Sequence, residues 1–192
     1  TGGDGAIASY ATPVDRESGD TWAVADWALQ YGFNPSETFV IPIAGAVRGA
    51  NGTYFRTDVS ITNRCATAVD VQANPDLLRT TPCRGSSSLG VMKYYPTTGG
   101  VIERELDLGL LQTSVMVDVV RTVFGIETDT IGHIVFSPSN GAFAATSRTY
   151  TIVEGSPATY GSSVPALGKS LSLRRGQSRR IGALQDTTKV TI

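Results

Sequence analysis

The chain of 192 residues has 16 Lys and Arg against 17 Asp and Glu, and only 17% of its residues are charged, where about 25% is usual. This near-neutral balance argues against a nucleic-acid partner, and no apolar run is long enough, at about 18 residues, to predict a membrane span. One basic cluster consists of Arg174, Arg175, Arg179 and Arg180. It lacks the interleaved aromatic residues that are typical of a nucleic-acid site. The 21 glycines, with abundant Thr and Ser, are typical of secreted β proteins.

Residues 1–37 are interpreted as an N-terminal arm or linker, because residues 1–20 are rich in Gly, Asp and Ser. Residues 21–31 predict a short helix, since Trp22, Ala25 and Leu29 recur at helical spacing, although partial alternation leaves a strand open. Four aromatic residues lie close together in this part of the sequence: Trp22, Trp27, Tyr31 and Phe33. We interpret them as an apolar anchor that docks on a neighbouring domain or subunit, in preference to a platform that stacks on sugar rings.

Alternating strands begin at residue 38. TFVIPI (38–43) contains Pro42, which predicts an edge strand, and RGANG (48–52) predicts a turn. YFRTDVSITN (54–63) alternates strictly, so Arg56 and Asp58 share one face as a polar pair. We interpret this pair as ordering the sheet, with recognition of a sugar or peptide as the alternative.

Further strands are predicted at 68–72, 90–96, 101–108, 113–120, 133–138 and 142–153. TTGG (97–100) and Ser139-Asn140-Gly141 predict hairpin turns, and RTVFG (121–125) predicts one helical turn. Short strands with frequent turns predict an all-β fold, an antiparallel, immunoglobulin-like β-sandwich over 38–153. In residues 154–192, SVPAL (163–167) echoes VIPIA (40–44). This predicts a linker with strands of a partial second module or an assembly tail.

Two cysteines, Cys65 and Cys83, lie in polar, turn-like surroundings and predict a disulfide that encloses an insertion at 73–88. Two free thiols are the alternative. Such a bridge would stabilise the fold by about 3 kcal/mol in the chain-entropy model and would place the protein outside the cytoplasm.

No catalytic residue, metal site or cofactor is predicted, and we expect no enzyme activity. The single histidine, His133, lies on an alternating strand without a nucleophile motif nearby, and a zinc site lacks ligands. Two acidic pairs are interpreted as solvated strand or turn residues: Glu103 with Glu105, and Glu127 with Asp129.

Four segments together resemble an immunoglobulin-like β-sandwich module of large secreted and surface proteins of environmental bacteria: residues 41–63, 93–100, 117–125 and 147–167. The resemblance spans roughly 38–167. It implies an extracellular or cell-surface location and no catalytic residues.

Three functions follow from these observations. The first is a structural or adhesive module that assembles by adding a strand or arm to a neighbouring copy or domain. The second is a carbohydrate-binding accessory domain, with polysaccharide as partner through Trp22 and Trp27. The third, an enzyme that depends on His133, has the least support.

Overall fold

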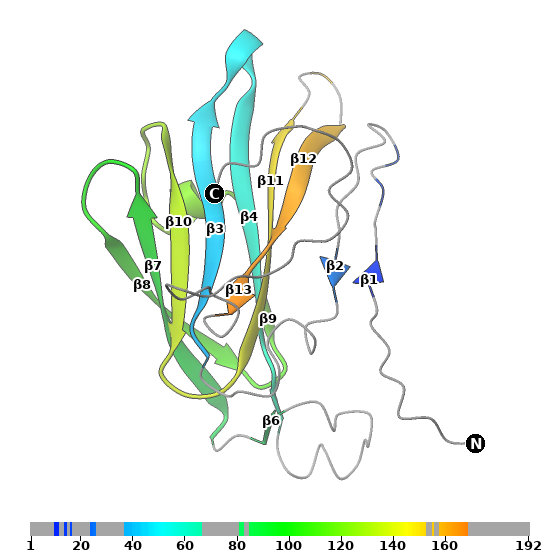
Figure 1. Cartoon of the computed structure of the whole chain (residues 1–192). Coiled ribbons are helices and arrows are strands. Elements are labelled where there is room, and N and C mark those ends of the chain that lie inside the picture. Colours follow the sequence, from blue (N-terminus) through cyan, green and yellow to red (C-terminus); the bar gives the residue numbers. More distant parts are fainter. Residues whose placement is uncertain are drawn as a thin grey trace, which may run out of the picture.

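The computed structural model describes residues 10–11, 14, 16, 24–25, 37–66, 81–82, 85–152, 155 and 158–168. Antiparallel strands dominate, which confirms the all-β class (Figure 1). Apart from strands, this part contains the 3-10 turn η1 (Ala50–Gly52) and the one-turn helix α3 (Val119–Thr122). The strands are β1 (Tyr10–Ala11), β2 (Val24–Ala25), β3 (Phe39–Arg48), β4 (Tyr54–Asn63), β5 (Cys65–Ala66), β6 (Thr81–Pro82), β7 (Ser87–Pro96), β8 (Ile102–Gly109), β9 (Thr113–Met116), β10 (Thr130–Pro138), β11 (Phe143–Ile152), β12 (Thr159–Pro165) and β13 (Leu167–Gly168).

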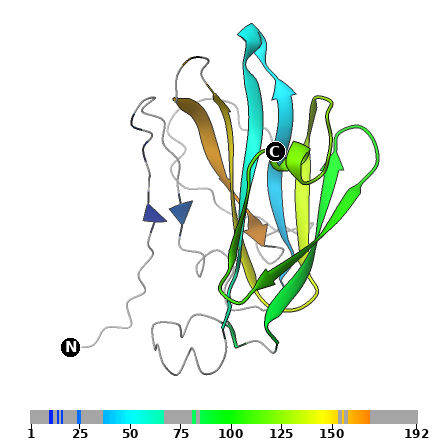
Figure 2. The ribbon, with the colours of Figure 1, turned by 180° about the vertical axis from the view of Figure 1, so that it is seen from behind.

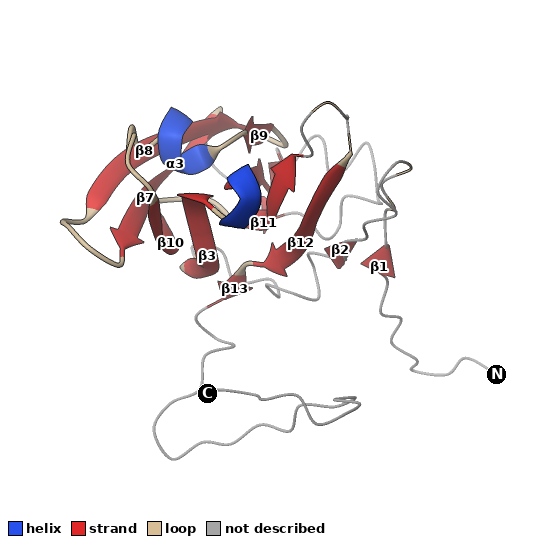
Figure 3. Ribbon diagram, turned by 90° about the horizontal axis from the view of Figure 1, so that it is seen from above, coloured by secondary structure: helices blue, strands red, loops and turns tan. Residues whose placement is uncertain are grey.

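The large sheet separates into two layers at the β3–β4 hairpin. The two strands pair only at the tip, from Ala46 opposite Arg56 to Arg48 opposite Tyr54. Beyond the tip, β3 continues with β13, β10, β7 and β8, which we call the β10 sheet, while β4 continues with β9, β11 and β12, which we call the β11 sheet. β3 then contacts β11 and β12, which are not its ladder partners, so the two sheets overlap (Figures 2 and 3).

Thr57 stabilises the point where the hairpin strands part. Its side chain is fully buried, and its hydroxyl accepts a hydrogen bond from the Gly45 N–H at 2.9 Å. The hydroxyl takes the place of a backbone carbonyl of β4, because the β3–β4 ladder ends at Ala46 and Arg56. The same hydroxyl lies 2.8 Å from that of Thr149 on β11. A hydroxyl that serves both neighbours satisfies a backbone donor whose burial would otherwise be costly.

One apolar core fills the space between the sheets. Phe39 and Phe136 stack in the β10 sheet at 5.0 Å, and Phe136 meets Phe143 of the β11 sheet edge-on at 4.9 Å. Helix α3 covers one end of this core with Val119 and Val120, which are both fully buried. The alternating residues of β4 thus point their apolar side, as predicted, into a sandwich core.

Three local predictions differ from the structure. β3 is not an edge strand, because it lies between β10 on one side and β4 and β13 on the other. Pro42 lies in a bulge, where two residues of β3 oppose His133 of β10. Proline has no backbone N–H, and a bulge is one of the places in a sheet where none is needed. Within the predicted helix 21–31, Val24–Ala25 instead form strand β2, antiparallel to β1, which matches the alternative left open there. The predicted strand 113–120 ends at Met116, because α3 begins at Val119.

The Ser139-Asn140-Gly141 segment does not form a hairpin. β10 pairs with β3 and β7, whereas β11 pairs with β4 and β12, so the segment carries the chain from one sheet to the other. The Ser139 N–H donates to the Leu89 carbonyl at 2.9 Å, and a Cβ on Gly141 would lie 2.3 Å from the Ser88 hydroxyl oxygen. Contacts to β7 therefore override the local turn preference.

The predicted domain boundary at residue 153 is also corrected. β12 adds to β11 and β13 adds to β3, so 159–168 complete the first sandwich rather than a second one. Residues 169–192, the rest of the predicted second module or tail, lie outside the described residues. So do the predicted strand 68–72 and most of the insertion at 73–88.

Cys65 is fully buried in β5, where its sulfur accepts the Ser88 hydroxyl at 3.4 Å and the Ala142 N–H at 3.3 Å. Cys83 lies outside the described residues, so the Cys65–Cys83 pairing stays a prediction. Among the helices of the described segments, none has the length and apolar character to cross a membrane.

Candidate functional site

An extended cluster of polar contacts lies on the outer face of the β11 sheet, alongside α3. It arises because β4 and β11 pair in register, with Arg148 opposite Asp58 and Tyr150 opposite Arg56, and because the chain from β9 into α3 crosses beside them. We call this cluster the polar network. Four arginines in it face four carboxylates and two tyrosines: Arg48, Arg56, Arg121 and Arg148; Asp58, Asp118, Glu127 and Asp129; Tyr54 and Tyr150.

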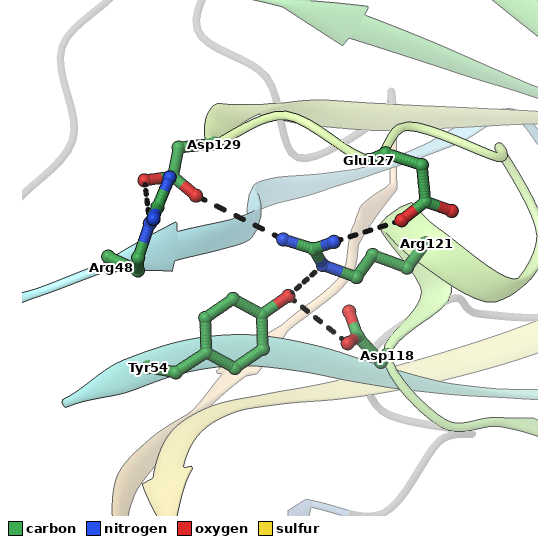
Figure 4. A network of polar contacts seen from close by, with 6 residues as sticks. All are labelled: Arg48, Tyr54, Asp118, Arg121, Glu127 and Asp129. Atoms are coloured by element: carbon green, nitrogen blue, oxygen red, sulfur yellow. Dashed lines mark hydrogen bonds and ion pairs between the residues drawn. The ribbon is translucent and has the colours of Figure 1, made fainter. Parts of the chain in front are cut away.

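Arg121 of α3 is the centre of one half of the network (Figure 4). Its Nε donates to the hydroxyl oxygen of Tyr54, and its Nη1 donates to Glu127 Oε2 at 3.1 Å. Its Nη2 lies 4.0 Å from Asp129 Oδ1, and Asp129 Oδ2 accepts Arg48 Nε at 3.0 Å. The guanidinium thus ties α3 to the β3–β4 hairpin and to the loop before β10.

Asp118 links this half to the sheet and occupies an unusual backbone conformation. Its φ of 48° and ψ of 56° lie in the left-handed region, which costs an L-residue about 1–2 kcal/mol. Its N–H donates to Asp58 Oδ1 at 2.8 Å, and its Oδ2 accepts the Tyr54 hydroxyl at 3.2 Å. Its Oδ1 is buried with no hydrogen-bond partner in the described part of the chain. A strained residue held by such contacts indicates that the surrounding fold fixes it.

Tyr150 is the centre of the other half. Its ring is 6% exposed and lies 4.9 Å from the guanidinium carbons of both Arg56 and Arg148. Its hydroxyl donates to Asp58 Oδ2 at 2.9 Å and accepts Arg56 Nε at 2.9 Å. Arg148 also donates to the Thr159 hydroxyl of β12 at 2.8 Å, so this half spans three strands.

The electrostatics keep both phenols protonated. Burial raises the pKa of Tyr54, and this outweighs the hydrogen bond from Arg121, which lowers it. Burial and the neighbouring Asp58 both raise the pKa of Tyr150. On the exposed side, the hydrogen bond from Arg48 lowers the pKa of Asp129. Each phenol therefore serves as a donor to a carboxylate, and neither is poised as a general base at neutral pH.

A small pocket of about 160 Å³ borders the network. It lies between the β7–β8 turn and the loop before β10, with Thr98, Ile126, Thr128 and Asp129 in its wall. Asp129 is already engaged by Arg48, so its carboxylate belongs to the network. Across the ranges that the structure describes, no three His, Cys, Asp or Glu side chains gather as a metal site.

The predicted pair Arg56 and Asp58 does share a face, and the Tyr150 hydroxyl bridges the two side chains. Glu127 and Asp129 are exposed, as predicted, and both also lie near Arg121. Glu103 pairs with Lys93 at 2.5 Å, and Glu105 is exposed two residues further along β8.

His133 stacks on Tyr95 at 4.9 Å, on the outer face of the opposite sheet. It therefore lies on the other sheet from Asp58 of the polar network. The predicted docking aromatics lie outside the described residues: Trp22, Trp27, Tyr31 and Phe33.

Sequence reasoning did not identify Asp118, Arg121, Arg148 or Tyr150. One signal was available: SRTY (147–150) alternates like FRTD (55–58), so antiparallel pairing of the two strands would place their polar faces together. No local pattern indicates Asp118 and Arg121, because they reach the network through the crossing of α3.

No protein-family model and no curated protein matches the chain. A solved structure titled "Crystal Structure of Thermotoga maritima 1070" is similar with a TM-score of 0.45 and 8% identity, over 68% of this chain and 94% of that chain. A similarity at this level carries no inference for this chain, so the resemblance to a module of bacterial surface proteins stays a prediction.

Proposed function

We propose that this chain is a non-catalytic structural or adhesive module that acts outside the cell and joins neighbouring copies through the β12 edge of its sandwich. The character of the polar network supports the structural part. Its charged groups pair with one another, and together they tie α3, the β3–β4 hairpin, β11 and β12 into one unit. Such an arrangement resists deformation rather than offering a reactive group to a substrate.

The observation that carries the proposal is a contrast between the two sheet edges. Edge strand β8 bears the charged run Glu103, Arg104, Glu105 and Asp107, which is how natural proteins prevent strand addition. Edge strand β12, TYGSSVP, bears no charge over its whole length. Its described ladder partner is β11, and the strand lacks the charged residues that oppose strand addition at β8.

The N-terminal arm is the proposed strand donor. β2 already contacts β12 without a ladder between them, and β1 pairs with β2 (Figure 1). If the arm of one copy reaches the β12 edge of the next, main-chain hydrogen bonds supply affinity without requiring a particular sequence.

The test is sedimentation velocity with negative-stain images of the full chain. We expect regular species larger than a monomer, lost in Ser162→Lys, because a charge on β12 opposes strand addition. Ser139→Lys is the matched control: it places the same charge on an exposed loop between the sheets. Identical assembly of both variants would remove the β12 edge from the mechanism, and a wild-type chain that stays monomeric would remove the assembly role.

The carbohydrate-binding alternative rests on Trp22 and Trp27, which lie outside the described residues, and it stays a prediction. Saturable polysaccharide binding that is lost in Trp22→Ala and Trp27→Ala would favour it over assembly.

A further inference from the structure

The pocket between the β7–β8 turn and the loop before β10, which we call the turn pocket, combines apolar walls with available polar groups. Thr98 and Thr128 line it, and within the described part of the chain neither hydroxyl has a hydrogen-bond partner. Ile102 and Ile126 also line it, and both are half-buried side chains that pack against the core. Asp129 adds a carboxylate to the wall. Apolar walls with a few polar groups are typical of a small-molecule site.

From the turn pocket we infer a binding site for one neutral sugar ring, the terminal residue of a glycan. The inference rests on the adhesive part of the proposed function, but it uses a surface separate from the β12 edge (Figure 1). The volume of about 160 Å³ suits one six-membered ring, because a cavity of about 150 Å³ holds benzene. The pocket is open on one side, so the rest of a glycan chain can stay in water.

The hydrogen-bonding groups of the pocket select hydroxyl groups on the ligand. Asp129 accepts hydrogen bonds from the side chain and the backbone of Arg48. A carboxylate has about four lone-pair sites, so Asp129 can still accept a hydrogen bond from a ligand. The hydroxyls of Thr98 and Thr128 can each donate and accept. A ligand that matches this set must donate at one position and exchange hydrogen bonds at others, as neighbouring sugar hydroxyls do.

The charges around the pocket favour a neutral ligand. The hydrogen bond from Arg48 lowers the pKa of Asp129, so this carboxylate is ionised at neutral pH. Arg48 Nε lies 3.0 Å from one of its oxygens and Arg121 Nη2 lies 4.0 Å from the other (Figure 4). A cationic ligand would meet these guanidinium groups, and an anionic ligand would meet the carboxylate itself. A neutral polyhydroxylated ring avoids both repulsions.

Contacts on both sides keep the pocket in shape. The Thr97 N–H donates to the Ile131 carbonyl at 2.8 Å, which ties the β7–β8 turn to β10. Across the pocket, Arg48 of β3 holds Asp129. Walls that are ordered before binding lower its entropic cost. The ligand is nevertheless small, with about a dozen heavy atoms in one sugar residue, and we expect a dissociation constant on the order of 1 mM.

Saturation-transfer difference NMR of the full chain tests the site, with the methyl glycosides of glucose, galactose and mannose as probes. We expect saturable binding of at least one of them. Thr128→Val keeps the shape of the side chain but removes its hydroxyl, and should raise the dissociation constant roughly fivefold. Thr97→Val is the matched control: Thr97 is the exposed neighbour of Thr98 and lies outside the pocket wall, so this variant should bind like the wild type.

Gly100→Leu is designed to fill the pocket. Gly100 lines it, and a Cβ at this position would meet no atom within 4 Å, so the fold can accept a side chain there. We expect this variant to lose glycoside binding, with far-UV circular dichroism to establish that every variant is folded. Three results would each overturn the inference: no saturable binding of any probe, equal binding by Thr128→Val and Thr97→Val, or undiminished binding by Gly100→Leu.

The same assay separates this site from the other proposals. Glycoside binding that survives in Gly100→Leu but is lost in Trp22→Ala and Trp27→Ala would refute the turn pocket in favour of the N-terminal aromatic residues. Glycoside binding that Ser162→Lys retains, in a chain whose wild type stays monomeric, would support the turn pocket and refute only assembly through the β12 edge. Assembly without any glycoside binding would refute the turn pocket alone.

Discussion

Tyr150 is the residue whose loss should reveal what the polar network contributes. In Tyr150→Phe the ring still fills its site, but Asp58 Oδ2 and Arg56 Nε lose the hydroxyl between them. Leaving partly buried partners unsatisfied costs about 1–3 kcal/mol, and we expect this loss in the free energy of unfolding by denaturant. Tyr160→Phe, on a side chain that is 52% exposed, should change the value by less than about 0.5 kcal/mol.

The raised tyrosine pKa values predict a loss of stability at alkaline pH. In the folded state, the pKa values of Tyr54 and Tyr150 lie above the ordinary value of 10.0. Their contribution is therefore complete below about pH 10 and is lost as the pH rises from there through the folded pKa. Burial raises the pKa of Tyr94 in the same direction, as a background common to all variants.

Unfolding free energies at about pH 8 and about pH 11 measure this loss. The fall between the two should be smaller in the Tyr54→Phe, Tyr150→Phe double variant than in the wild type. An equal fall would mean that these two phenols titrate alike in the folded and unfolded chains.

At the scale of elements, β7 and β10 approach too closely for any side chain at Gly132. A Cβ there would lie 2.2 Å from the Tyr95 carbonyl oxygen, so the strands would have to separate beside the β3 bulge. Overpacking of this kind costs about 1–3 kcal/mol, and Gly132→Ala should lower the thermal midpoint measured by circular dichroism. Gly100→Ala, where nothing lies within 4 Å, is the matched substitution that should leave it nearly unchanged.

Sequence patterns identified elements well where one face of a strand is buried. YFRTDVSITN matches β4 residue for residue, because alternation directly reports the core side of a strand. Patterns failed where a distant contact decides the outcome. Asn140-Gly141 has hairpin chemistry, but Asn140 is tied to Leu89 of β7, so the segment crosses between sheets. Pro42 likewise tolerates a central strand because β10 offers a bulge.

At the scale of the whole molecule, the sequence predicted the all-β sandwich class. It predicted only part of the candidate site. Arg56 and Asp58 were identifiable because they share one strand face. Asp118 and Arg121 were not, because α3 joins them to that face only after both sheets have formed. The domain end at residue 153 was placed too early because it was inferred turn by turn, whereas β12 and β13 join the sheets by long-range pairing.

The proposed addition of an arm to the β12 edge predicts how far assembly proceeds. A two-fold contact is closed and stops at a dimer, whereas an arm added to a neighbouring edge can be repeated. The wild type should therefore form species larger than a dimer, and Ser162→Lys should be a monomer. Mass photometry of the two proteins at one concentration distinguishes these sizes. A Ser162→Lys variant that still forms large species would place the assembly contacts on a surface other than the β12 edge.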